Sequence, residues 1–347
     1  MPQSSSAVGT PAASESISPD HIFEIGFAFW KSKALLSAVE LGVFTTLSER
    51  PLGGEALTER IGINRRGGRD FLDALVALNL LDRDGAGRYT NRPDCELYLD
   101  ARKPTYIGGQ LERLNEPLYE CWGHLTEALR TGHGPSALAN GGYAALYADD
   151  AAFKSFLRAM TGSSLIPARA LAEIFPWHLH ETVMDIGTAQ GCVPVELAHA
   201  HTHLRGGGFD LPEVGRAFQD YVHRNSLSDR LTFHPGDFLR DDLPGADVLI
   251  MGRILHNWDL PTKQLLVRKA AQAVPPGGAL VVYDNIIDNE RRYRPHSLLA
   301  SLNMLIDTPA GSEFTEEECI NWMHKAGFRD IRMERLDLIN TAAIGFK

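Results

Sequence analysis

Three acidic residues follow three consecutive predicted strands in the second half of the chain. Asp185 ends an apolar run that leads into a glycine-rich turn, and Asp210 and Asp237 follow the next two runs. In an open parallel sheet, ligands bind beyond the carboxyl ends of the strands, where these side chains would meet. Carboxylates there can accept hydrogen bonds from ribose hydroxyls or an exocyclic amine. Because no phosphate-binding lysine accompanies them, we expect a neutral or cationic nucleoside ligand.

The glycine-rich turn at residues 187–191 reads GTAQG, which differs from the dinucleotide-binding pattern GxGxxG. Gly187 and Gly191 have no Cβ, so the backbone can pass close under a ligand. Ala189 stands where a pyrophosphate would need a closer approach. The turn therefore favours a nucleoside site without phosphates, with a plain tight turn of an α/β fold as the alternative.

His256 is the candidate general base. A predicted strand ends near Met251, and Asp259 with Pro261 begins the next helix, so His256 lies on a loop at the ligand edge of the sheet. An imidazole with a pKa near 6.5 can accept a proton close to neutrality. A purely structural histidine is the alternative, but the position beside the predicted ligand favours a base.

From residue 181 onward, short apolar runs alternate with helical patterns, which predicts a Rossmann-like α/β domain with a mostly parallel sheet of seven strands. The predicted strands are 183–186, 206–210, 231–234, 248–251, 279–283, 330–335 and 341–346. The predicted helices are 193–201, 213–225, 260–274 and 315–326.

Residues 20–105 predict a mainly helical unit of winged-helix order, with helices at 54–61 and 64–79 before a hairpin that turns at residues 84–87. Such a unit can bind DNA or serve as a structural or dimerising module. The second helix carries Arg65, Arg66 and Arg69, but the chain has a net charge of -10 and no longer basic stripe. We therefore expect a dimerising module and no nucleic-acid partner, with a metabolite-sensing DNA-binding regulator as the less favoured alternative.

The length of 347 residues predicts more than one domain. Residues 1–19 are rich in Ser, Ala, Gly and Pro, which predicts a flexible tail without a targeting signal. Residues 106–165 are expected to form a helical linker that contributes to an acceptor pocket, and residues 166–347 to form the nucleoside-binding domain. No apolar run reaches the roughly 18 residues of a membrane span. Four scattered cysteines favour a reducing cytoplasm, so we expect a cytoplasmic protein with no membrane partner.

Taken in order, the motifs resemble those of S-adenosylmethionine-dependent O-methyltransferases of the caffeic acid, isoflavone and hydroxyindole type, most closely the bacterial branch that modifies aromatic natural products. The resemblance spans residues 22–347 and is carried by DIGTAQG, GFDLP, GDF, MGRILHNWD, PGGALVVYD, IDTPAGSEFT and AGF. It implies a class I methyltransferase domain preceded by a winged-helix dimerisation domain. It also implies a homodimer through the N-terminal helices around Phe29 and Trp30, S-adenosyl-L-homocysteine as a product, and no metal.

The resemblance further implies a role for individual residues. His256 would be the catalytic base, held by Glu313 and by Asp284, which is one methylene shorter than the more frequent Glu. Thr188 and Ala189 replace common glycines. The implied cofactor-binding residues are Ser164, Asp185, Gly187, Gly191, Asp210, Leu211, Gly236, Asp237, Phe238 and Arg253.

Flat apolar side chains with a few polar groups suit an aromatic acceptor. The candidates for this pocket are Trp122, Phe153, Phe156, Met160, Trp258, Asn303, Met304 and Asp307. Together these features predict methyl transfer to a hydroxyl of a small phenolic, naphthoate or polyketide-like molecule. Methylation of carbon or nitrogen, or a decarboxylation or hydroxylation on the same fold, remain as alternatives.

Overall fold

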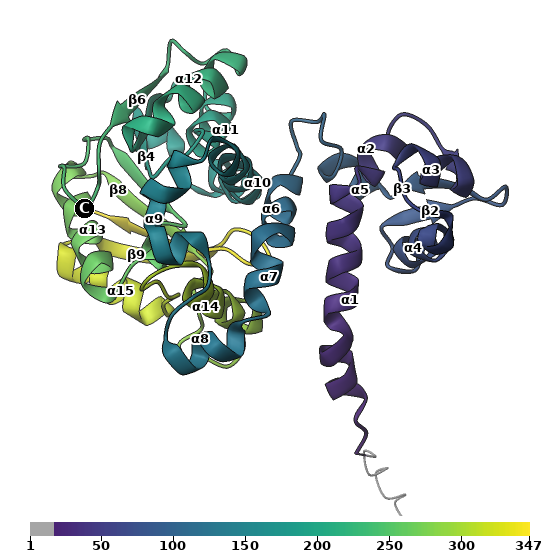
Figure 1. Cartoon of the computed structure of the whole chain (residues 1–347). Helices are drawn as coiled ribbons and strands as arrows, with labels where there is room; N and C mark the ends of the chain where they lie inside the picture. The colour runs from purple at the N-terminus through teal and green to yellow at the C-terminus, as the bar shows by residue number, and fades with distance from the viewer. Residues whose placement is uncertain (1–16) are drawn as a thin grey trace, which may run out of the picture.

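The computed structural model describes residues 17–347, so most of the predicted tail lies outside the described residues. Figure 1 shows an N-terminal helical unit beside a larger unit built on a central sheet, with helices α6 and α7 between them. This arrangement confirms the predicted α/β architecture, in which a mainly helical unit precedes a mostly parallel sheet of seven strands.

The large sheet has seven strands in the order β6-β5-β4-β7-β8-β10-β9. The pairs from β6 to β8 are parallel, and β10 runs antiparallel to both β8 and β9. The chain leaves β4 toward β5 on one side and returns to β7 on the other, so the direction of winding reverses between β4 and β7. Ligands of open α/β sheets bind at such a reversal. The strands are β4 (Thr182–Ile186), β5 (Arg205–Asp210), β6 (Leu231–Pro235), β7 (Val248–Gly252), β8 (Ala279–Asp284), β9 (Arg329–Arg335) and β10 (Thr341–Phe346).

Helices cover both faces of this sheet because alternate side chains of the central strands are apolar on both sides. In β7, Leu249 and Met251 pack with helices α13 and α15, whereas Val248 and Ile250 pack with α10 and α11 on the opposite face. These and neighbouring helices are α10 (Asp150–Ile174), α11 (Cys192–Ala200), α12 (Gly215–Arg224), α13 (Leu260–Ala273), α14 (Pro295–Asp307) and α15 (Glu316–Ala326). Such two-sided burial fixes the strand ends that carry the candidate site.

The N-terminal unit has its own core, which includes the buried Leu57, Leu72 and Leu75. Its small sheet has the order β1-β3-β2, and the hairpin of β2 and β3 follows the helix pair α3 and α4, as the winged-helix pattern predicts. The elements are α1 (Asp20–Glu40), α2 (Val43–Leu47), β1 (Leu52–Gly53), α3 (Gly54–Arg60), α4 (Arg65–Ala77), β2 (Leu81–Arg83), β3 (Arg88–Asn91) and α5 (Pro93–Tyr98). In contrast to this core, the first half of α1 exposes its aromatic side chains.

Helices connect the two units and form one wall of the larger one. They are α6 (Gly108–Arg113), η1 (Leu114–Leu118), α7 (Tyr119–Trp122), α8 (Leu125–Thr131) and α9 (Ala137–Ala148), which lead into α10. Helix α10 runs without interruption through residues 165 and 166, where the sequence predicts a domain boundary. Across residues 17–347, none of the helices is both long enough and apolar enough to cross a bilayer.

Two glycines let α6 and α10 cross closely. A Cβ on Gly109 would lie 2.6 Å from the carbonyl oxygen of Arg158, and one on Gly162 would lie 2.8 Å from the carbonyl oxygen of Ile107. Because both neighbours are backbone atoms, neither can move aside as a flexible side chain would.

We therefore expect Gly109→Ala to lower the free energy of unfolding by about 1–3 kcal/mol, the usual cost of overpacking a fixed contact. Gly67→Ala in α4 is the matched control, since nothing lies within 4 Å of its Cβ position. Alanine there should be neutral or stabilising by up to about 1 kcal/mol. Urea unfolding measures both, and equal stability of the two variants would contradict the close crossing.

Candidate active site

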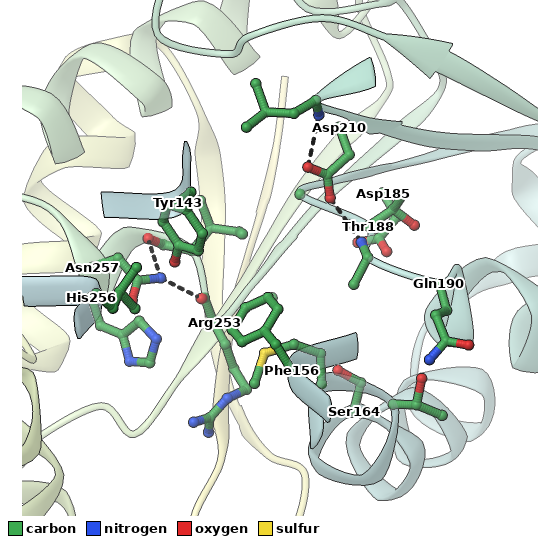
Figure 2. Close-up of a pocket in the computed structure, with 18 of the residues that line it drawn as sticks. Tyr143, Phe156, Ser164, Asp185, Thr188, Gln190, Asp210, Arg253, His256 and Asn257 are labelled. Atoms are coloured by element: carbon green, nitrogen blue, oxygen red, sulfur yellow. Dashed lines mark hydrogen bonds between the residues drawn. The ribbon is translucent and has the colours of Figure 1, made fainter. Parts of the chain in front are cut away.

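A cavity of about 300 Å³ lies at the carboxyl ends of β4, β5 and β7 and is closed by side chains of α6, α9, α10 and α14. Figure 2 shows labelled residues from β4, β5, α9 and α10, and from the segments after β4 and β7, facing a common space. Most of the predicted cofactor residues line it: Ser164, Asp185, Gly187, Asp210, Leu211, Gly236, Asp237, Phe238 and Arg253. The structure thus brings side chains from three successive strands to one place.

The two glycines of the turn after β4 serve different purposes. Gly187 lines the cavity with a φ of 74°, and a Cβ there would lie 2.2 Å from Cδ1 of Ile254. Gly191 is absent from the described residues that line the cavity. It is the left-handed N-cap of α11, and a Cβ there would meet the Phe218 ring at 2.6 Å. Gly187 thus lines the cavity with Ile254 packed against it, and its close approach to a ligand stays a prediction, while Gly191 shapes the turn against Phe218.

Thr188 and Ala189, at turn positions where the sequence resemblance implies glycines, are accommodated locally. Thr188 is buried against Gly208 of β5, where a Cβ would lie 2.2 Å from its Cγ2. Ala189 has a φ of 49°, and its N–H donates to Oδ2 of Asp210 at 2.8 Å. The bulkier turn thus fits because β5 is glycine-rich beside it, and it fixes the Asp210 carboxylate.

Burial disfavours the ionised forms of two carboxyl groups of the site, those of Asp185 and Asp210. It raises the pKa of Asp185 to about 7 and the pKa of Asp210 to about 6, although the N–H groups of Ala189 and Leu211 favour the Asp210 carboxylate. Hydroxyl donors or a positive charge beside these groups would stabilise their charged forms. The pair therefore suits a ligand that combines a ribose with a cationic group.

The segment after β6 forms the third side of the nucleoside region. Oδ1 of Asp237 accepts the N–H of Leu239 at 2.9 Å, and Oδ2 lies 3.5 Å from Nε of the exposed Arg240. The Phe238 ring lies edge-on to Trp258, with centroids 5.8 Å apart. An aromatic ring and a carboxylate in adjacent positions can hold the face and the amine of a purine.

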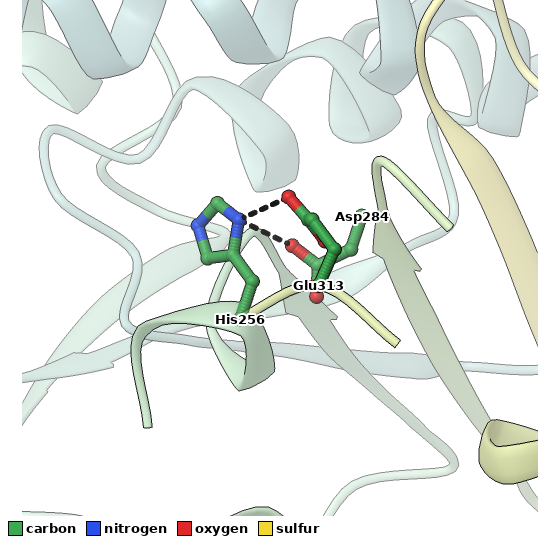
Figure 3. Close-up of side chains that lie close together, drawn as sticks. All are labelled: His256, Asp284 and Glu313. Atoms are coloured by element: carbon green, nitrogen blue, oxygen red, sulfur yellow. Dashed lines mark hydrogen bonds and ion pairs between the residues drawn. The ribbon is translucent and has the colours of Figure 1, made fainter. Parts of the chain in front are cut away.

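His256 lies in a short helical turn, Leu255–Asn257, after β7 and is buried. Its Nδ1 lies 2.9 Å from Oε1 of Glu313 and 3.4 Å from Oδ1 of Asp284 (Figure 3). Only the contact with Glu313 is a hydrogen bond. In neutral His256, an N–H at Nδ1 donating to Glu313 leaves the Nε2 lone pair free, as a general base requires.

The charges around His256 shift its titration. Burial opposes the imidazolium, but the Asp284 and Glu313 carboxylates outweigh it and raise the pKa of His256. Burial also opposes ionisation of Glu313, but His256 and the Asn285 amide lower its pKa overall. Asp284 has no hydrogen-bond partner among the described residues, and burial raises its pKa to about 7. Glu313 is therefore the carboxylate that both bonds His256 and is stabilised in its charged form.

The loop that carries Glu313 is held by residues that sequence motifs do not reveal. The Asn285 amide donates to Oε1 of Glu313 at 3.1 Å. The N–H of Ser312 donates to the carbonyl of His256 at 2.8 Å. Nζ of the buried Lys263 donates to Oγ of Ser312 at 2.9 Å. These bonds connect α13 and β8 to both members of the His256–Glu313 pair.

The donor atoms of His256, Asp284 and Glu313 lie within 4.8 Å of one another, close enough for a metal ion among the described residues. A cation there would have to replace the Nδ1–H that bonds Glu313. That the reaction needs no metal ion therefore stays a prediction.

The predicted acceptor-pocket residues divide into two groups. Phe156, Met160, Trp258, Asn303, Met304 and Asp307 line the cavity. Trp122 and Phe153 are absent from the described residues that line the cavity. Instead, Nε1 of Trp122 donates to Asn303 at 2.8 Å, and the Phe153 ring packs against Tyr147 with centroids 4.7 Å apart. These two residues support cavity walls that other residues form.

Sequence analysis missed several lining residues, including Gln110, Arg113, Tyr143 and Tyr147. They lie on α6 and α9, outside every recognised motif. The paired tyrosines four residues apart on one predicted helix were the only available signal, and spacing of that kind equally describes an ordinary core face.

Comparison with known proteins identifies related molecules. Residues 122–329 match the model of the O-methyltransferase domain, and residues 23–101 match that of the O-methyltransferase dimerisation domain. The tetracenomycin polyketide synthesis 8-O-methyl transferase TcmO of Streptomyces glaucescens is 44% identical, over 95% of this chain and 97% of that protein. The N,N-dimethyltransferase OxyT of Streptomyces rimosus is 35% identical, over 91% and 92%. The crystal structure of human N-acetylserotonin methyltransferase in complex with SAM has a TM-score of 0.87 at 28% identity, over 97% and 99%.

The charge cluster predicts how His256 titrates. Its pKa should lie above the ordinary 6.5, and Glu313→Gln should lower it because the variant removes the carboxylate that stabilises the imidazolium. NMR titration of the histidine ring resonances measures both values. Glu317→Gln, an exposed change on α15, is the control and should leave the titration of His256 unaltered. An unchanged or higher pKa in Glu313→Gln would contradict the assigned pairing.

Proposed function

Because the chain belongs to the S-adenosylmethionine-dependent O-methyltransferase family, we propose that it methylates a hydroxyl of a small aromatic natural-product intermediate, with His256 as the general base. The observation that supports this most directly is the buried hydrogen bond between Glu313 and His256, the member of the pair that lines the cavity. The relative TcmO acts on a polyketide, which supports an aromatic, polyketide-like acceptor.

The residues of the cavity fit S-adenosylmethionine. Asp210 keeps unused lone pairs for the ribose hydroxyls beyond its two backbone bonds. Asp237 and Phe238 suit the adenine, and Gly187 presents its backbone to the cavity, with Ile254 packed where a Cβ would lie. Asp185 and Ser164 lie where they could meet the amino-acid end. When bound, the cofactor supplies an electrophilic methyl group on a sulfonium centre.

The chain's own residues then have to generate and aim a nucleophile. A phenol has a pKa near 10 and is mostly protonated at neutral pH. Nε2 of His256 removes its proton, and Glu313 stabilises the imidazolium that results. The raised pKa of His256 lies closer to the pKa of the phenol, which makes the proton transfer less unfavourable. Since only the neutral imidazole can act as a base, the rate should fall as the pH drops through that pKa.

Flat side chains around the cavity support an aromatic acceptor. The Tyr143 ring lies 6.0 Å from that of Phe156 and 6.4 Å from that of Trp258, measured between centroids. Fixing a planar acceptor between such walls holds its oxygen in line for transfer, and orientation of this kind supplies much of the rate in a dry site.

N-methylation is a second candidate, because OxyT is an N,N-dimethyltransferase 35% identical to this chain. A protonated amine also needs a base before it can accept a methyl group, so His256 would serve either reaction. Incubation with labelled S-adenosylmethionine and matched phenol and benzylamine acceptors distinguishes the two reactions, because mass spectrometry shows which acceptor gains the methyl group. DNA binding is less favoured, because Arg65 and Arg69 form ion pairs with Glu55 and Asp73.

A homodimer through the dimerisation domain completes the proposal. The side chains of Phe27, Phe29 and Trp30 on α1 are 47%, 53% and 60% exposed, an unusual cluster for a surface facing water. A second copy would cover this face. All four cysteines are buried and free, which supports the expected cytoplasmic location.

If His256 is the base, His256→Ala should lower kcat by about 10²- to 10⁴-fold, the usual contribution of a general base. The Kd for S-adenosylhomocysteine, measured by calorimetry, should stay unchanged because the ring does not hold the nucleoside. His199→Ala, an exposed change at the end of α11, provides the control. A near wild-type rate in purified His256→Ala would overturn the assignment.

The homodimer predicts that Trp30→Glu dissociates the protein into folded monomers, because a buried carboxylate would face an apolar partner surface. Sedimentation velocity measures the mass. Leu338→Glu, at a site 82% exposed on the other unit, is the matched control and should remain dimeric. A Trp30→Glu protein that sediments as a dimer would refute α1 as the interface.

A further inference from the structure

A buried ion pair lies in the wall of the cavity away from the sheet. Arg113 at the end of α6 donates to Oδ2 of Asp307, the last residue of α14, at 2.6 Å. The two side chains are only 10% and 8% exposed, and both line the cavity. Removing charges from water is costly, and one hydrogen bond compensates for only part of that cost.

Several hydrogen-bonding atoms around this pair have no partner. Within residues 17–347, the bond to Asp307 is the one hydrogen bond of the Arg113 side chain, which leaves further N–H groups of its guanidinium free. Oδ1 of Asp307 and Oε1 of Gln110 are buried without a partner among the described residues. Buried polar atoms are nearly always satisfied, so donors and acceptors gathered at one cavity wall indicate a polar ligand group.

The surrounding walls restrict the shape of that group. The Arg113 guanidinium lies 5.4 Å from the centroid of Phe156, whose ring also packs against Tyr143. A planar ring system that fits between these aromatic side chains would bring a substituent on its edge against Arg113 and Asp307. The recognised group is therefore part of a flat molecule.

This polar position is distinct from the proton-accepting site. The carboxylates beside His256 are those of Glu313 at 2.9 Å and Asp284 at 3.4 Å, measured from Nδ1. Arg113 and Asp307 lie on α6 and α14 instead of the loops that hold the base. They can therefore bind a substituent of the acceptor other than the hydroxyl that is methylated.

We propose that Arg113 and Asp307 recognise a neutral, planar substituent of the aromatic acceptor in which a carbonyl oxygen lies beside an N–H or O–H donor. The carbonyl accepts from Arg113, and the donor group bonds Oδ1 of Asp307. A carboxylate offers no donor and meets the charge of Asp307, so it is excluded. This inference rests on the proposed function, since it assigns the class of acceptor for the same cavity.

The test measures the Kd of three naphthols for the full-length protein saturated with S-adenosylhomocysteine. One naphthol is unsubstituted, and the others carry a carboxamide or a carboxylate on the ring without the hydroxyl. The carboxamide should bind at least about tenfold more tightly than either of the others, since a hydrogen bond to a charged group contributes about that much. Equal binding of the carboxamide and the unsubstituted naphthol would overturn the proposal.

Asp307→Asn provides a readout that a purely structural ion pair would not give. Without the negative charge, Arg113 can pair with the carboxylate, so the preference for carboxamide over carboxylate should fall by about tenfold or reverse. An unchanged preference would contradict the proposal. A Glu317→Gln protein, with an exposed change on α15, should keep the wild-type preference.

A variant that keeps only one of the two buried charges can misfold, so a double variant that removes both charges is the second test. Arg113→Met with Asp307→Leu replaces the pair by apolar groups, an exchange that proteins often tolerate. It should bind S-adenosylhomocysteine normally and all three naphthols alike. Retained discrimination would refute the recognition pair while leaving methyl transfer intact. Failure of the wild-type protein to bind S-adenosylhomocysteine would instead refute the proposed function.

Discussion

Burial of one imidazole beside two carboxylates is the interaction on which the proposed chemistry depends. In water, His256 would exchange protons freely and Glu313 would have no fixed orientation. Inside the protein, the 2.9 Å contact fixes the ring and the tautomer, and the carboxylates favour the imidazolium despite burial. Such an arrangement is unstable unless the loops that hold it are rigid. The bonds from Lys263, Ser312 and Asn285 meet that need.

The same principle explains the nucleoside side of the cavity. Asp185 and Asp210 are buried enough for their pKa values to rise to about 7 and about 6, so they favour a ligand that brings donors or positive charge. The turn that positions them departs from the common glycine pattern at Thr188. Gly208 on the neighbouring strand leaves the space that Thr188 fills, so the departure is compensated within the sheet.

Strand ends and their motifs were predictable because each depends on a local pattern. An apolar run followed by glycine or an acid places Asp185, Asp210 and His256 at one edge of a parallel sheet without knowledge of distant contacts. Helix α14 was not predicted, although its residues Asn303 and Asp307 were. The Arg113–Asp307 pair joins positions 194 residues apart in the sequence, and no local pattern reports such a contact. The acceptor side is built from contacts of this kind.

A crystal structure of the protein with S-adenosylhomocysteine and a bound phenol would test the central claim most directly. The account predicts the nucleoside along the turn after β4, with its ribose on Asp210. It also predicts a phenol oxygen about 2.6–3.2 Å from Nε2 of His256, the distance of a proton transfer. A nucleoside bound elsewhere, or a phenol oxygen outside hydrogen-bonding reach of His256, would contradict it.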